Sequence, residues 1–120
     1  MEGKVYKIEN KSYIEITEPI ACERDIIDII GMCISKDIHL LFFREEVFTK
    51  EFTNLKTGLA GIVLQKLSNY HISVVAIIEN KTIIKGRFKE LLTELNKSNN
   101  FKVFNNTRDV ENWIQKYSEI

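Results

Sequence analysis

The chain has 120 residues, of which seventeen are basic, seventeen are acidic and 44% are hydrophobic. This length suits one globular core, so residues 1–120 are expected to form a single domain. A formal net charge of zero provides no overall field toward nucleic acid or an anionic membrane. Without a signal peptide or an apolar run long enough to span a bilayer, a cytoplasmic protein with no nucleic-acid or membrane partner is expected.

The first third of the chain predicts a hairpin, a helix and a buried strand. Residues 5–8 and 13–16 are β-rich and flank four polar residues, a spacing typical of a β-hairpin. Isoleucines and a cysteine at helical spacing then predict a first helix over residues 23–35. The nearly continuous apolar run 38–43 is typical of a strand that is covered on both faces.

The remainder alternates helices with strands. Residues 72–78 form a second buried apolar run, and 101–104 form a last short strand. Three further helices are marked by apolar residues at helical spacing, namely Leu59, Ile62, Val63, Leu67 and Tyr70; Phe88, Leu91, Leu92 and Leu95; and Val110, Trp113, Ile114 and Tyr117. Asn106 or Thr107 is the expected cap of the last helix. The predicted order ββαβαβαβα is a mixed, mostly parallel α/β sheet opened by a hairpin, with four helices.

The segment 54–61, Asn-Leu-Lys-Thr-Gly-Leu-Ala-Gly, is rich in small residues just before the second helix. Backbone N–H groups at a helix start favour an anion, and a nearby lysine adds positive charge. The candidate residues for binding a partner or an anion are Asn54, Lys56, Thr57, Gly58 and Gly61. The alternative is structural, with the small residues allowing close packing of helix on sheet and Asn54 or Thr57 acting as the cap.

Other reactive side chains predict no catalytic or metal site. Glu45, Glu46 and Glu51 precede the second helix, and solvated loop charges are favoured over an acid–base pair. His39 lies in the third predicted strand and His71 just before the fourth, without metal-ligand spacing or a nucleophile motif. We therefore expect no enzyme activity, no metal and no cofactor.

The two cysteines, the basic segment and the last helix also have favoured structural interpretations. Cys33 is expected in the core, and Cys22 near the start of the same helix is badly placed to form a disulfide with it. Residues 81–97 carry five basic side chains and are interpreted as a solvated helix face. Trp113 and Tyr117 are expected to be core residues; if either is exposed, it becomes a candidate dimer or partner contact.

The order of elements resembles the STAS domain of bacterial anti-sigma-factor antagonists and transporter tails. In that family a loop after the third strand carries an Asp-Ser-Ser-Gly-Leu-type motif, whose first hydroxyl is phosphorylated to release a partner. Here residues 55–59, Leu-Lys-Thr-Gly-Leu, occupy the matching place. Thr57, Gly58 and Leu59 agree with the motif, whereas Leu55 and Lys56 replace the aspartate and the phosphorylated residue.

The chain is also similar to an uncharacterised bacterial family of small STAS-like proteins, the domain-of-unknown-function family 4180. The resemblance lies in residues 51–52 (Glu-Phe), 55–61 (Leu-Lys-Thr-Gly-Leu-Ala-Gly), 64–66 (Leu-Gln-Lys) and 69–70 (Asn-Tyr). It weakens at residues 79–82 and in the third helix. This resemblance implies a STAS-like fold and no particular activity.

Two functions are expected from these observations. The first is a non-catalytic regulatory module that binds a protein partner, or a second copy of itself, through residues 54–61 and the second helix. The alternative is a small-ligand module that binds a nucleotide or another phosphate compound at the same helix N-terminus.

Overall fold

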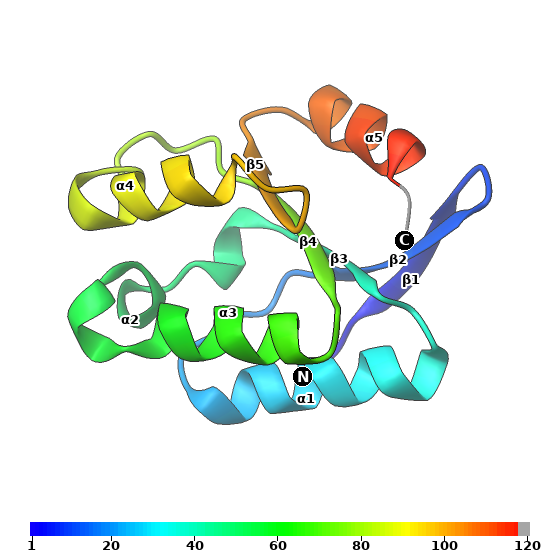
Figure 1. Cartoon of the computed structure of the whole chain (residues 1–120), viewed down its shortest axis with the longest axis horizontal. Helices are drawn as coiled ribbons and strands as arrows, with labels where there is room; N and C mark the ends of the chain where they lie inside the picture. The colour runs from blue at the N-terminus through cyan, green and yellow to red at the C-terminus, as the bar shows by residue number, and fades with distance from the viewer. Residues whose placement is uncertain (118–120) are drawn as a thin grey trace.

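The computed structural model describes residues 1–117 and contains a five-stranded sheet in the order β1-β2-β3-β4-β5 (Figure 1). The strands are β1 (Lys4–Ile8), β2 (Lys11–Ile16), β3 (Leu40–Phe43), β4 (Ser73–Ile77) and β5 (Phe101–Phe104). β1 pairs antiparallel with β2, and all the other pairs are parallel. The predicted mixed α/β sheet, with a hairpin that supplies the antiparallel edge strand, is confirmed.

Five α-helices are present, α1 (Glu23–Lys36), α2 (Lys50–Thr53), α3 (Leu59–Asn69), α4 (Gly86–Leu95) and α5 (Thr107–Lys116). Two 3₁₀ turns, η1 (Glu45–Val47) and η2 (Leu55–Thr57), flank α2. The predicted count of four helices is therefore one too low. The additional helix, α2, is a single turn and is too short to show a periodic apolar pattern. Its N-cap is Thr49, whose hydroxyl accepts the N–H of Phe52 at 3.1 Å.

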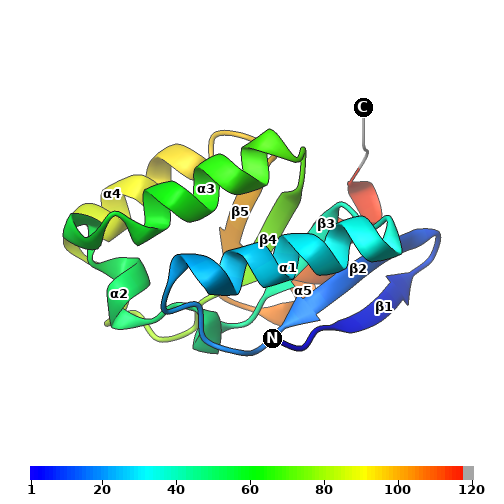
Figure 2. The ribbon, with the colours of Figure 1, turned by 90° about the horizontal axis from the view of Figure 1, so that it is seen from below.

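The helices divide unequally between the two faces of the sheet. α1, α3 and α4 lie on one face, whereas α5 packs on the other (Figure 2). The larger core contains isoleucines of α1, phenylalanines of the β3–α3 region and alternate residues of the central strands. The smaller core joins Val110 and Ile114 of α5 to the opposite set of strand residues. All five residues of β4 are buried, as expected for a strand covered on both faces.

The polypeptide reverses direction at each end of the sheet. The segment with η1, α2 and η2 follows β3 at the carboxyl end of the parallel strands, and α3 then runs back to the amino end, where it leads into β4 (Figure 1). With eleven residues in α3, the two ends of this helix are about 16 Å apart. Residues 54–58 and His71 therefore lie at opposite ends of the sheet.

Candidate functional site

Residues 54–58 form a closely hydrogen-bonded turn before α3. The Asn54 side chain accepts the N–H of Lys56 at 3.1 Å, so it caps η2. The Thr57 hydroxyl donates to the carbonyl oxygens of Glu51 and Asn54, at 2.5 and 3.0 Å, and accepts the N–H of Leu59 at 3.2 Å. The capping alternative therefore holds for both Asn54 and Thr57, and their polar atoms contribute to the shape of the turn.

Gly58 and Gly61 have different structural roles. Gly58 joins η2 to α3 with φ of 79°, a left-handed conformation that glycine adopts without a steric penalty. Gly61 is exposed inside α3, and a Cβ atom built there meets nothing within 4 Å. The close-packing interpretation therefore does not apply to Gly61; in this segment the small residue buried against the core is Ala60.

A second exposed glycine lies on the neighbouring helix. Gly31 is in the interior of α1, and a Cβ atom built there also meets nothing within 4 Å. Exposed isoleucines accompany both glycines, with Ile27 and Ile34 on α1 and Ile62 on α3. The two helices lie side by side (Figures 1 and 2) and are joined by an ion pair of 3.3 Å between Lys66 and Glu23. We call the exposed surface formed by Gly31, Gly61 and these three isoleucines the α1–α3 face.

One carboxylate at the carboxyl end of the sheet is engaged by backbone. The Glu45 Oε1 atom accepts the N–H groups of Glu79 and Asn80, at 2.6 and 2.8 Å. Two adjacent N–H groups that converge on one oxygen form an anion-binding turn, and here the chain fills it with its own side chain. Glu45 thus connects the segment after β3 to the segment after β4, a role that the sequence did not predict.

The two histidines, which the sequence left without a role, lie at the amino end of the sheet. A cavity of about 690 Å³ opens there between the C-terminal ends of α3 and α4 and the beginnings of β4 and β5. His39 lies one residue before β3, rather than inside the strand as predicted, and lines this cavity together with His71. Inside it the Tyr117 hydroxyl donates to Ser73 Oγ at 2.9 Å, and Ser73 is 5% exposed.

Sequence reasoning missed this cavity because its lining comes from four separate stretches of the chain, namely residue 39, residues 64–73, residues 95–101 and residue 117. One local signal was available. His71 adopts φ of 55° immediately beyond the C-cap of α3, in the left-handed conformation that glycine usually takes after a helix. Glycine is the usual residue at this position, so a histidine just after a helical pattern is a departure that can be recognised in the sequence.

The cysteines lie as predicted. Cys33 is fully buried in the larger core, and burial raises the pKa of its thiol to about 12. Cys22 is exposed at the N-cap of α1, and its Sγ is 3.7 Å from Asp25 Oδ2. Both are free thiols.

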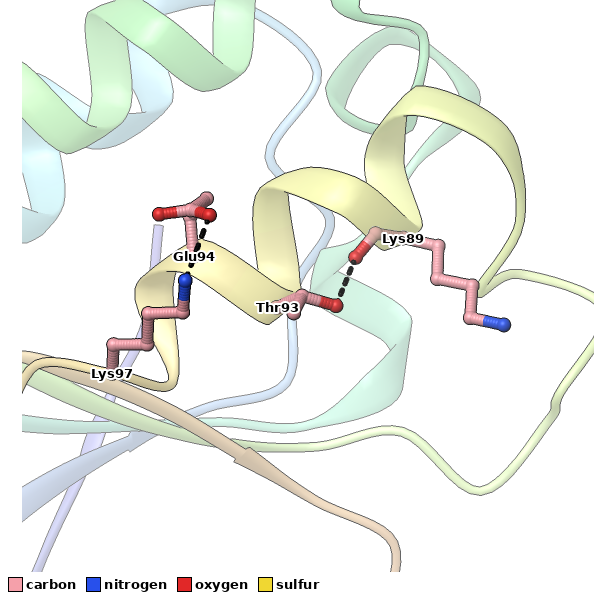
Figure 3. Close-up of polar contacts among 4 residues, drawn as sticks. All are labelled: Lys89, Thr93, Glu94 and Lys97. Carbon is pink, nitrogen blue, oxygen red and sulfur yellow. Dashed lines mark hydrogen bonds and ion pairs between the residues drawn. The ribbon is translucent and has the colours of Figure 1, made fainter.

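The basic segment includes the exposed surface of α4. Figure 3 shows the Lys97 ammonium paired with Glu94 at 3.1 Å and the Thr93 hydroxyl donating to the Lys89 carbonyl at 3.0 Å. The Lys89 side chain extends away from these contacts. Trp113 and Tyr117, for which a core position was expected, are half-buried against the smaller core, with ring centroids 5.1 Å apart.

Across residues 1–117, no three histidine, cysteine, aspartate or glutamate side chains cluster closely enough to hold a metal ion. Within the same range, no helix has both the length and the apolar character needed to cross a bilayer.

A mixed sheet with one antiparallel edge strand and helices on both faces defines an α/β domain. In the segment after its third strand, side chains cap the short helical turns, and the Glu45 carboxylate binds the loop after β4. The chain belongs to the family described as domain of unknown function (DUF4180), whose model matches residues 7–114. This confirms the predicted family. No curated protein and no solved structure matches the chain.

Proposed function

We propose that the protein is a non-catalytic interaction module that binds a protein partner, or a second copy of itself, through residues 54–61 and the adjoining α1–α3 face. The observation that carries this proposal is a pair of exposed helical glycines, Gly31 in the interior of α1 and Gly61 in the first turn of α3. A helical glycine costs up to about 1 kcal/mol of helix stability relative to alanine, and within residues 1–117 neither glycine makes room for a neighbour. A partner backbone lying close against the helices would give both glycines a purpose.

The side chains around the glycines support the same proposal. Large apolar residues are rarely exposed in a cluster unless another surface covers them, and Ile27 and Ile34 are 45% and 57% exposed. Lys56 is exposed just before α3, and within residues 1–117 its side chain makes no hydrogen bond or ion pair. We propose that Lys56 pairs with an acidic or phosphorylated group of the partner while the isoleucines supply apolar contact.

The structure gives less support to the alternative of a phosphate compound at the N-terminus of α3. Thr57 Oγ1 already accepts the first N–H of the helix, and the hydroxyl proton is directed at carbonyl oxygens. This alternative stays a prediction. A non-enzymatic role is likewise part of the proposal. It is supported by Glu45, one of the candidate acid–base residues, whose carboxylate already accepts hydrogen bonds from the N–H groups of Glu79 and Asn80.

The STAS-like classification and a cytoplasmic location belong to the proposal as well. The first is supported by the order of elements and by the position of residues 54–61 after β3. The second is supported by two cysteines that remain free thiols, as is usual in a reducing compartment.

The experiment that tests the interaction is affinity capture from a lysate of the source cells, combined with sedimentation of the purified protein. The variants Lys56→Glu and Gly61→Arg alter the proposed surface, and Lys89→Glu, an exposed charge reversal on α4, is the matched control. We expect wild type and Lys89→Glu to capture the same partner, or to self-associate equally, and the two surface variants to lose it. Equal capture and equal sedimentation by all four proteins would contradict the proposal.

A further inference from the structure

The amino-end cavity has the size and the chemical character of a small-molecule site. Its volume of about 690 Å³ falls in the range of cavities that enclose most of a small organic molecule. Leucines of α3 and α4, namely Leu64, Leu67 and Leu95, form an apolar part of its wall. Side chains that both donate and accept hydrogen bonds, among them His71, Asn99 and Asn100, form a polar part.

Several of these polar groups are unused by the protein itself. Within residues 1–117, the side chains of Ser68, His71, Asn99 and Asn100 make no hydrogen bond to another residue, although all four line the cavity. The imidazole of His71 is held at the rim by a left-handed backbone, at φ of 55°. Glycine would relieve that strain, so the imidazole is retained at a cost in stability.

The charge of the lining restricts the ligand. Among the described residues that line the cavity there is no lysine, arginine, aspartate or glutamate. Lys11 lines a smaller neighbouring cavity that shares His39 and Tyr117 with the first. Its ammonium group is committed to the carbonyl oxygens of Gln115 and Tyr117, and Asp37 lines the same neighbouring cavity. A phosphate or carboxylate would therefore be desolvated without a cation to pair with it.

The distribution of polar and apolar groups restricts the ligand further. A lipid chain would leave the amides and imidazoles unpaired, and a sugar would press hydroxyl groups against leucines. A flat ring with nitrogen and oxygen atoms along its edges presents apolar faces and polar edges at once. We propose that this cavity binds an uncharged heterocyclic compound of about the size of a nucleoside, with its ring against the leucines and its edge atoms bonded to His71 and the asparagines.

The test is a titration of the purified protein with adenosine, guanosine, cytidine, uridine and their four 5′-monophosphates, followed by amide NMR shifts. We expect at least one nucleoside to bind saturably, with its largest shifts at residues 71–73 and 98–101. Its 5′-monophosphate should bind about tenfold more weakly or worse, because the lining has no cation. Absence of saturable binding by every nucleoside, equal or tighter binding by the monophosphate, or shifts confined to residues 54–61 would overturn the proposal.

Two glycine variants separate the imidazole from the backbone. His71→Gly removes the ring where the backbone already has a glycine-like conformation, so the melting temperature should equal or exceed that of wild type while nucleoside binding falls about tenfold. Glu9→Gly is the matched control, since Glu9 also has a positive φ (54°) but lies in the turn between β1 and β2. It should bind as wild type does. Asn99→Ala, an exposed substitution at the rim, gives a second measurement. Unchanged affinity in both His71→Gly and Asn99→Ala would overturn the proposal.

Discussion

At the scale of single residues, the two glycines at the start of α3 differ in what they require. Gly58 has φ of 79°, whereas Gly61 lies in the first turn of α3 with open space where a Cβ would point. A Cβ atom in the left-handed region collides with the backbone, while alanine inside an exposed helix is favoured over glycine. The same substitution should therefore have opposite effects three residues apart.

We predict that Gly58→Ala lowers the free energy of unfolding by about 1 kcal/mol and that Gly61→Ala raises it by about 1 kcal/mol. Urea unfolding of the two variants beside wild type measures both changes. If Gly61→Ala also weakens partner capture, the helix stability given up at Gly61 is linked to binding. Destabilisation by Gly61→Ala would contradict the open space found around a Cβ atom at this position.

The buried thiol of Cys33 predicts a pH dependence of stability. Its pKa is raised from 9.0 to about 12 by burial. Because the pKa in the fold is higher than in the unfolded chain, the contribution to stability is complete below pH 9 and is lost as the pH rises toward 12. Burial and then Glu15 raise the pKa of Tyr13, so this residue acts in the same direction.

The variant Cys33→Ala isolates the contribution of the thiol, because Tyr13 titrates equally in both proteins. At pH 7 the variant should be less stable than wild type by about 1 kcal/mol, the cost of a small core cavity. At pH 10.5, wild type should have lost about 2 kcal/mol that the variant retains, so the order should reverse. Denaturant unfolding at both pH values measures this. A constant difference between the two proteins would contradict a raised thiol pKa.

At the scale of elements, the carboxyl end of the sheet is held by a contact between two loops. Glu45 of η1 accepts the N–H groups of Glu79 and Asn80 beyond β4. Aromatic rings join the η1–α2 segment to α4, with the centroids of Phe48 and Phe88 6.0 Å apart and those of Phe52 and Phe88 6.3 Å apart. The part of this end that follows β3 is therefore filled by the protein's own side chains. A cavity of about 370 Å³ lies beside the ends of β4 and β5, and the cavity of about 690 Å³ opens at the amino end.

We predict that Glu45→Ala lowers the free energy of unfolding by about 1 kcal/mol, because it removes an acceptor shared by two N–H groups that water then hydrates. Amide hydrogen exchange should accelerate at residues 79 and 80 in particular. Glu46→Ala, at the exposed neighbouring position, is the control and should leave both rates unchanged. Unaltered exchange in Glu45→Ala would mean that this contact does not hold the loop.

At the scale of the whole molecule, the two faces of the sheet depend on very different numbers of helices. The larger core draws on α1, α2, α3 and α4, whereas in the smaller core α5 is the helix that packs against the strands. Ile114 is fully buried there. A single truncation on α5 therefore affects a whole face of the sheet.

We predict that Ile114→Ala lowers the free energy of unfolding by about 3 kcal/mol, within the range for large-to-small substitutions in a core. Gln115→Ala, at the exposed next position, should change it by less than about 0.5 kcal/mol. Thermal or denaturant unfolding followed by circular dichroism measures both. A loss as small as that of the control would show that α5 contributes little to stability.

Most of the fold could be predicted from the sequence because its signals are local and repeated. The isoleucines of α1 recur at helical spacing, and β4 is apolar after its first residue. These patterns predict both the type of each of these two elements and its burial. Asn106, one of the two predicted caps of the last helix, does accept the N–H of Asp109 at 2.8 Å. A single turn such as α2 leaves no periodic pattern, and this is why it was missed.

Whether a candidate site could be predicted also depends on how far apart its residues are in the sequence. The order of elements, the family and the position of residues 54–61 were determined by the sequence itself, because propensity and spacing act between near neighbours. Tertiary structure decided that Glu45 binds a loop thirty-four residues away and that His71 shares a cavity with residues of three other stretches of the chain. Those contacts depend on how helices and strands pack in space. No local sequence pattern predicts which side chains, distant along the chain, come into contact.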